Sequence, residues 1–230
     1  MKIQFLEPIA SITVDCVIFG FDGQKLEVLL IKRGSDPEAG KWALPGGFME
    51  KNETLDDAAT RVLDKMTGVS NVYMEQFSTF GKLDRHPMAR VITVGYYAMI
   101  DSTHSRLNPS WHASETKWFE IKEVPKMPFD HTQIFEKALI TLKKELTLRP
   151  IGFELLPTKF TLTDLQNLYE IVLDEKLDRR NFRRKIKSMG ILTELDEVRP
   201  GAHIGATLYK FDKKQYKLLK SNGFSFNFTK

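Results

Sequence analysis

The segment between Asp178 and Met189 carries basic and apolar residues in a pattern that suits a helix. At about 3.6 residues per turn, the apolar Phe182, Ile186 and Met189 fall on one side and the cationic residues on another. Cations aligned in this way bind phosphates by charge, and arginine also forms paired hydrogen bonds with guanine in the major groove of DNA. The expected basic stripe consists of Arg180, Arg183, Arg184 and Lys187.

Other polar residues near this segment suit the same chemistry. Arg199, His203 and Lys210 lie in or beside a polar loop further along, from which side chains could reach backbone phosphates or a minor groove. The alternative for all of them is a charged surface that contacts only solvent. The candidate DNA contacts are Arg179, Arg180, Asn181, Arg183, Arg184, Lys187, Arg199, His203 and Lys210.

Short elements around the basic segment follow the order of an α+β winged helix-turn-helix domain. Thr163-Asp-Leu-Gln166 has the pattern of a capping box, which predicts a helix from there to about Asp174. Asp178 suits the N-cap of the next helix, Arg179–Met189, and Gly190 suits its end. Two strands are expected on either side of the polar loop Asp196–Ala206, at Ile191–Leu195 and Thr207–Phe211.

The first part of the chain alternates strands and helices. Asp22-Gly23 favours a tight turn between two apolar runs, Ser11–Phe21 and Lys25–Lys32, which predicts a hairpin. Apolar residues recur at helical spacing over Leu55–Met66, and Gly68 is expected to end that helix. Further strands are predicted at Met74–Phe80, Val91–Ile100 and Glu115–Ile121, a helix at Phe129–Leu146 and a junction at Thr147–Pro157. The expected domains are residues 1–150 and 151–230.

Composition and charge narrow the class of protein. Of the 230 residues 42% are hydrophobic, enough for packed cores, and the single cysteine, Cys16, excludes an internal disulfide. No apolar run approaches the roughly 18 residues of a membrane span, and residues 1–10 lack the layout of a signal peptide, so a soluble cytoplasmic protein is expected. Residues 151–230 hold 15 Lys and Arg against 10 Asp and Glu, whereas residues 1–150 hold 19 against 20. This asymmetry indicates a polyanion partner for the last third.

A second motif begins at Trp42-Ala-Leu-Pro-Gly-Gly-Phe48. Together with Glu53, Arg61 and the residues around Gly68, it resembles the Nudix box. The positions in register are Gly47, Glu53, Arg61, Leu63, Gly68 and Val69. The resemblance covers residues 11–125 and implies an α/β Nudix-like sandwich, with a mixed sheet between helices.

Three positions at which the Nudix box carries glutamate hold Val62, Lys65 and Met66 here. In Nudix hydrolases those carboxylates hold divalent cations, which neutralise a diphosphate and activate the attacking water. Valine and methionine cannot ligate a hard cation, and lysine repels one. We therefore expect no catalytic residue, no bound metal and no cofactor, and we expect Arg61 and Glu53 to form an ion pair that braces the loop.

The order of motifs along the whole chain resembles the NrtR-type Nudix-related transcriptional regulators. That family implies a homodimeric repressor that binds an inverted-repeat operator in double-stranded DNA. Some branches respond to ADP-ribose and control NAD metabolism, and others govern sugar catabolism, including the use of arabinose. The family carries Gly-Arg-Pro-Ala where this chain has His203-Ile-Gly-Ala206, which leaves Arg199 as the candidate to replace the missing arginine. The motifs are Phe129-Asp-His131, Leu155-Leu-Pro157, Phe160-Thr-Leu162, Asp178–Phe182 and Leu208–Phe211.

A cleft on a fold of this kind can be kept as a sensor after catalysis is lost. Loss of the metal-binding glutamates favours a neutral sugar such as L-arabinose as the effector, although Lys65 could contact the phosphate of ADP-ribose. The candidate effector contacts, placed by the resemblance, are Lys32, Arg33, Trp42, Phe48, Arg85 and Arg90.

Two other functions stay open. The first is Nudix hydrolysis of a nucleoside diphosphate derivative through a rearranged metal site, and the second is a module that binds RNA. RNA is disfavoured because no aromatic stacking platform accompanies the basic face. The carboxylates available for a rearranged site are Glu50, Glu53, Asp57 and Asp64.

Overall fold

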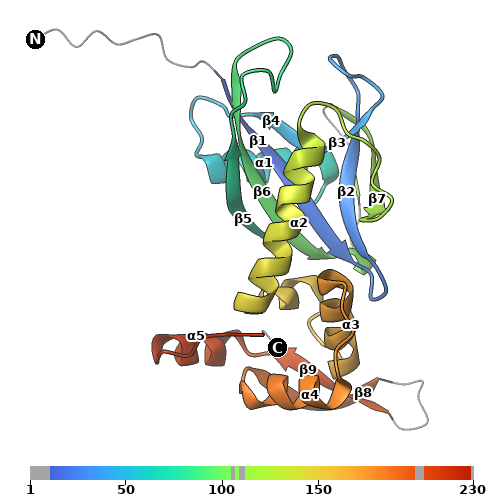
Figure 1. Ribbon diagram of the computed structural model, residues 1–230, viewed down its shortest axis with the longest axis vertical. Helices are drawn as coiled ribbons and strands as arrows, with labels where there is room; N and C mark the ends of the chain where they lie inside the picture. The colour runs from blue at the N-terminus through green and yellow to red at the C-terminus, as the bar shows by residue number, and fades with distance from the viewer. Residues whose placement is uncertain (1–10, 105–106, 109–111, 200–204, 229–230) are drawn as a thin grey trace, which may run out of the picture. The chain divides into compact units, whose positions relative to one another are not determined.

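The computed structural model describes residues 11–104, 107–108, 112–199 and 205–228 (Figure 1). The chain divides into two compact units. The first is built mainly from Val28–Met99 with flanking residues up to Leu139. The second is built mainly from the described residues after Ile140, together with Gly20–Glu27 and Ile100–His104. No helix among the described residues is both long and apolar enough to cross a membrane.

A seven-stranded sheet forms the centre of the first unit, with the order β3-β2-β1-β6-β5. The short strand β4 pairs with β1, and β7 pairs with β2. The predicted hairpin is confirmed, because Asp22 accepts hydrogen bonds from the backbone N–H groups of Gln24 and Lys25 at 2.8 and 2.7 Å. The strands are β1 (Ser11–Phe21), β2 (Leu26–Arg33), β3 (Trp42–Ala43), β4 (Gly46–Phe48), β5 (Tyr73–Phe80), β6 (Val91–Asp101) and β7 (Ala113–Glu120).

Two helices accompany this sheet, and α2 crosses its near face in Figure 1. Helix α1 (Leu55–Thr67) begins at a capping box formed by Thr54 and Asp57, and it ends at Gly68, as predicted. Gly68 has a φ of 76°, and a Cβ there would lie 2.9 Å from Asn108. Helix α2 (His131–Leu148) starts two residues later than the predicted helix. Phe129 has a φ of +56°, which no helical residue adopts.

The second unit has the helix, helix, hairpin order of a winged helix. Its core includes Leu165, Tyr169, Phe182 and Ile186, none more than 3% exposed. Helix α5 follows the hairpin and has no counterpart among the predicted elements. The elements are η2 (Pro150–Leu155), α3 (Leu162–Leu173), α4 (Arg179–Ser188), β8 (Leu192–Arg199), β9 (Ala206–Phe211) and α5 (Lys213–Ser221).

Two predicted details of this unit are wrong. The capping box at α3 is made by Thr161 and Asp164, so the helix begins before the predicted Thr163. The side chain of Gln166 instead donates to Glu170 and to the carbonyl of Leu177. Strand β8 is longer than predicted because pairing with β9 resumes beyond a register shift, at Val198 with Thr207 and at Arg199 with Ala206.

Candidate functional site

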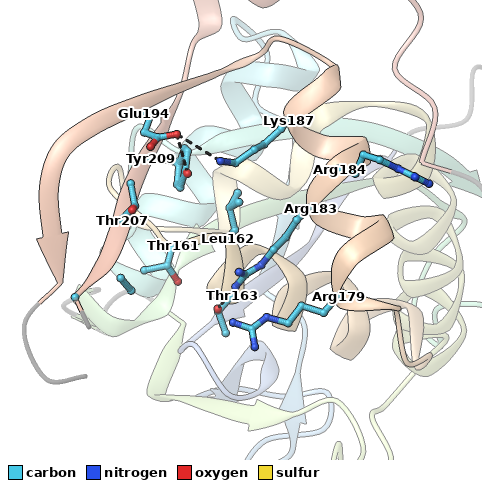
Figure 2. Close-up of a pocket in the computed structure, with 12 residues that line it drawn as sticks. Thr161, Leu162, Thr163, Arg179, Arg183, Arg184, Lys187, Glu194, Thr207 and Tyr209 are labelled. Carbon is cyan, nitrogen blue, oxygen red and sulfur yellow. Dashed lines mark hydrogen bonds and ion pairs between the residues drawn. The ribbon is translucent and has the colours of Figure 1, made fainter. Parts of the chain in front are cut away.

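Side chains from α3, α4, β8 and β9 line a groove of about 760 Å³ in the second unit (Figure 2). Its cations come from successive turns of α4, and Asp178 caps the first turn as predicted. Phe182 and Ile186 hold the opposite side of the helix in the core, which explains why the cations face outward. The lining residues are Thr161, Leu162, Thr163, Arg179, Arg183, Arg184, Lys187, Glu194, Gly205, Ala206, Thr207 and Tyr209.

One N–H of the Arg183 guanidinium has no hydrogen-bond partner among the described residues. Its Nη2 donates to the hydroxyl of Thr163 at 3.0 Å. Its Nε is buried and has no partner among the described residues. Burial, and then repulsion from Arg179, lower the pKa of Arg183, but a guanidinium stays charged at neutral pH. Arg183 lines the groove, so its positive charge can attract a phosphate that enters there.

Lys187 lies near an acidic residue on the opposite side of the groove. Its Nζ is 3.5 Å from Glu194 and 5.2 Å from the centre of the Tyr209 ring. The hydroxyl of Tyr209 donates to the same Glu194 carboxylate at 2.9 Å. Hydrogen bonding with Tyr209 and the nearby Glu194 raise the pKa of Lys187, so the lysine is a cation at neutral pH.

Arg179 and Arg184 also line the groove, and the remaining candidate DNA contacts in the described part of the chain lie outside its lining. Arg184 donates to the side chain of Asn181 at 3.0 Å. Arg199 forms an ion pair with Asp164 at 2.8 Å. Arg180 and Lys210 are exposed but do not line the groove, and His203 lies outside the described residues. The polar residues of the groove that sequence reasoning missed are Thr161, Thr163, Glu194, Thr207 and Tyr209, because only cations were sought.

A second cleft, of about 620 Å³, opens in the first unit. The aromatic ring of Phe129 at this cleft contacts the side chains of both Arg33 and His86. The guanidinium of Arg33 is 5.2 Å from the centre of the Phe129 ring, and His86 stacks on that ring at 5.3 Å. Arg33 also donates to the carbonyl of Pro37 at 2.8 Å. The arrangement offers a cation and apolar surface side by side, which suits an anion attached to a flat ring.

Arg85 is fixed in a buried network at the same cleft. Its guanidinium donates to both carboxylate oxygens of Asp130, at 2.8 and 2.9 Å, and to Asp15 at 3.2 Å. The Nδ1 of His131 accepts a hydrogen bond from the backbone N–H of Leu44 at 3.1 Å. Because Nδ1 accepts this hydrogen bond, the ring carries its proton on Nε2, which lies 3.6 Å from Asp15, and burial lowers the pKa of His131. These groups hold the shape of the cleft.

The six candidate effector contacts divide into two groups. Arg33, Phe48 and Arg85 line the cleft. Lys32, Trp42 and Arg90 do not line it. Lys32 pairs with Glu115 at 3.4 Å, Trp42 packs edge-on against Phe119, and Arg90 donates to the carbonyls of Gly81 and Lys82 at 2.8 Å each. Sequence reasoning missed Phe129, His86 and His131 in this cleft; only the motif Phe129-Asp-His131 could have indicated two of them.

The helix of the Nudix box, α1, carries apolar residues at two of the positions where the family has glutamate. Among the residues that the structure describes, no group of three acidic, histidine or cysteine side chains is arranged to hold a metal ion. Val62 is fully buried, and Met66 lines the cleft as an apolar residue. Arg61 donates to Glu53 at 2.6 and 2.8 Å and to the carbonyl of Phe48 at 2.9 Å, which confirms the predicted brace. These hydrogen bonds lower the pKa of Glu53 to about 2.

Comparisons with known proteins match both units. Residues 10–138 match the NUDIX domain, and residues 152–211 match the NrtR DNA-binding winged helix domain. The chain is 33% identical to the ADPR responsive transcriptional repressor NtrR of Acinetobacter baylyi, over 91% of this chain and 85% of that protein. The structure resembles that of Shewanella oneidensis NrtR complexed with a 27mer DNA, with a TM-score of 0.76 and 29% identity, covering 94% of this chain and 97% of that one.

A third comparison concerns the first unit alone. The NUDIX domain of Shewanella oneidensis NrtR, in a structure complexed with ADP ribose, is 33% identical with a TM-score of 0.52, covering 57% of this chain and 87% of that one. The fold and the family matches together define a DNA-binding regulator with a Nudix domain. The chain belongs to the NrtR-type family of Nudix-related transcriptional regulators. The predicted fold class, a Nudix-like sandwich followed by a winged helix, is confirmed.

Proposed function

We propose that this chain is a transcriptional repressor that binds an operator through the α4 groove and ADP-ribose in the cleft of its first unit. The observation that carries the proposal is the similarity over 91% of the chain to a repressor described as ADPR responsive. The paired Arg33 and Phe129 support it, because ADP-ribose combines an anionic diphosphate with a flat base.

The comparisons favour ADP-ribose over L-arabinose, the effector that we expected from the sequence. That expectation assumed that a diphosphate needs the metal ligands of the Nudix box. A guanidinium such as Arg33 can neutralise a diphosphate directly, so loss of the carboxylates removes the means of hydrolysis without removing the means of binding. The proposed effector contacts are therefore Arg33, Phe48, Phe129 and His86, with Arg85 holding the cleft in shape.

Thermal denaturation of the full chain tests the effector. We expect ADP-ribose to raise the melting temperature in the presence of a chelator, since a ligand that binds only the native state stabilises it. L-arabinose, ribose 5-phosphate and AMP are the comparison ligands. A shift with L-arabinose and none with ADP-ribose would reverse the proposed effector while leaving the DNA-binding role intact.

For the DNA-binding role, we propose a homodimer on an inverted repeat. Two recognition helices related by a two-fold axis enter successive major grooves about 34 Å apart, so the half-site spacing of the operator is the quantity to measure. Selection of duplexes from a random pool by the full chain gives that spacing directly. Recovery of sequences without symmetric half-sites would count against the dimer.

We also propose that the boundary between the two domains lies between residues 150 and 151, as expected from the sequence. Its support is local, because α2 ends at Leu148 and Pro150 begins η2. Limited proteolysis of the full chain, followed by mass determination of the fragments, tests this boundary.

Hydrolysis is the competing function. We infer that the chain is a regulator and not an enzyme, since Val62 and Met66 supply no oxygen ligand for the metal that activates water. Incubation of ADP-ribose with the chain and Mg²⁺ or Mn²⁺ should release no AMP. Robust release of AMP would overturn this inference.

A further inference from the structure

The chain continues for several residues beyond α5, and this C-terminal segment, residues 222–228, packs into the second unit. It carries three phenylalanines: Phe224, Phe226 and Phe228. Phe226 and Phe228 are only 3% and 8% exposed, although the segment forms no helix or strand. The segment also lies beyond residue 211, where the match to the winged-helix family ends.

Phe228 joins three elements of the unit. The centre of its ring lies 4.5 Å from that of Tyr169 in α3 and 5.1 Å from that of Phe182 in α4. Its backbone N–H donates to the carbonyl of Thr147, in the last turn of α2, at 2.7 Å. The ammonium of Lys185, also in α4, lies 5.3 Å from the ring centre. One residue thus ties the recognition helix to α2 and α3.

The apolar contacts of helix α4 are confined to one side of the helix. Its ten residues, RRNFRRKIKS, are mostly cationic, and like charges on neighbouring turns repel each other. Phe182 and Ile186 are its only buried residues among the described ones. The aromatic neighbours of Phe182 are Tyr169 and Phe228, at 5.7 and 5.1 Å. Removing the Phe228 ring would leave Phe182 with one of these two aromatic contacts.

We propose that Phe228 is a positioning residue for DNA recognition: it fixes the orientation of α4 in the unit without touching DNA itself. The inference rests on the proposed DNA-binding role of α4. Base readout needs side chains held in one geometry, whereas attraction of phosphates needs only the charges. Loss of Phe228 should therefore weaken sequence-specific binding more than it weakens non-specific binding.

The test compares Phe228→Ala, Phe228→Leu and Phe224→Ala in the full chain. Phe224 is the matched control, because its ring contacts Tyr216 of α5, at 6.4 Å, and no ring contact with α4 is formed among the described residues. Each variant is titrated with an operator selected by the wild-type chain and with a scrambled duplex of equal length.

We expect Phe228→Ala to reduce the ratio of operator affinity to scrambled affinity by about tenfold, the effect of losing the readout of one base pair. Affinity for the scrambled duplex and its salt dependence should stay near wild type, because all the cations remain. Phe228→Leu keeps an apolar side chain but loses the ring contacts with Tyr169 and Phe182, so it should reduce the ratio by an intermediate amount and speed exchange in α4 to a lesser degree. Phe224→Ala should leave it unchanged.

Amide hydrogen exchange supplies a readout that needs no DNA. The amides of α4 should exchange faster in Phe228→Ala than in Phe224→Ala. A folded Phe228→Ala variant with the wild-type ratio and wild-type exchange in α4 overturns the inference. If circular dichroism shows Phe228→Ala to be unfolded, the same two measurements on Phe228→Leu decide, and wild-type values there overturn it. If the wild-type chain selects no operator, the proposed function fails, and exchange in α4 still tests the anchoring by Phe228.

Discussion

The ammonium group of Lys187 lies 3.5 Å from the carboxylate of Glu194, across the groove that we propose for DNA. Helix α4, the proposed recognition helix, therefore pairs one of its cations with an acidic residue of β8. A phosphate that contacts Lys187 must replace this interaction, and the negative charge of Glu194 opposes its approach.

Replacing that carboxylate should strengthen non-specific binding. We expect Glu194→Gln to raise affinity for random duplex DNA several-fold and to make its dependence on salt steeper, because one more lysine becomes available to phosphates. Fluorescence anisotropy at a series of salt concentrations measures both quantities. Glu197→Gln is the control, since Glu197 pairs with Lys159 outside the groove. Equal effects of the two variants would assign the gain to net charge alone.

Removal of the arginines on α4 should separate the two proposed binding sites. We expect Arg183→Ala and Arg184→Ala to abolish measurable operator binding, because both arginines line the groove and would make charge-assisted contacts with DNA. Affinity for ADP-ribose in the DNA-free protein should stay the same. Calorimetric titration with ADP-ribose checks the second expectation, and a loss of effector affinity would show that the variants disturb the whole chain.

Replacing Arg33 tests the cleft. We expect Arg33→Ala to lower affinity for ADP-ribose by about tenfold or more, since a charge-assisted contact with the diphosphate would be lost. Arg90→Ala removes an arginine that lies outside the cleft lining and should have little effect. The measurement is the dissociation constant for ADP-ribose, and similar losses in both variants would argue against the proposed site.

The brace between Arg61 and Glu53 should make part of the stability depend on acid pH. The pKa of Glu53 in the folded chain is about 2, because Arg61 donates to the carboxylate, whereas an unperturbed glutamate has a pKa of about 4.3. The stabilisation is therefore fully present above about pH 4.3 and is lost as the pH falls towards 2. Glu53→Gln should lower the free energy of unfolding by about 1 to 2 kcal/mol at pH 7.

Urea unfolding between pH 7 and pH 3 checks this dependence. The difference between wild type and Glu53→Gln should shrink as the pH falls. The exposed Glu115, paired with Lys32 at 3.4 Å, provides the control Glu115→Gln, which should change the free energy little at any pH. A difference for Glu53→Gln that is constant across the range would contradict the account.

Local patterns in the sequence were sufficient to predict most of the helices and strands of the fold. The turn at Asp22-Gly23, the end of α1 at Gly68 and the cap of α4 at Asp178 each depend on residues next to one another, and each is confirmed. The start of α2 was misplaced because tertiary structure holds Phe129 at a positive φ, which no local pattern reveals. Helix α5 was missed although a local signal for it exists, because Asp212 caps its first turn; none of its residues is buried.

The two sites differ in how far sequence could describe them. Most of the cations of the groove lie on one helix, so their spacing was enough to bring Arg183, Arg184 and Lys187 together. The second cleft is assembled from strands, helices and loops that lie far apart in the sequence, and the contact of Phe129 with Arg33 and His86 depends on how these segments fold together. Trp42 looked like a stacking surface for a ligand, but its ring is used against Phe119.

The backbone of Tyr209 in β9 exchanges two hydrogen bonds with that of Phe160, at 2.8 and 3.0 Å. Exposed strand edges are templates on which a second chain can add a strand, and this is a common route to aggregation. At Tyr209 the outer N–H and C=O groups of β9 are already occupied within the same molecule. A strand from a second copy would therefore have to displace an existing backbone pair at this residue before it could add to the edge.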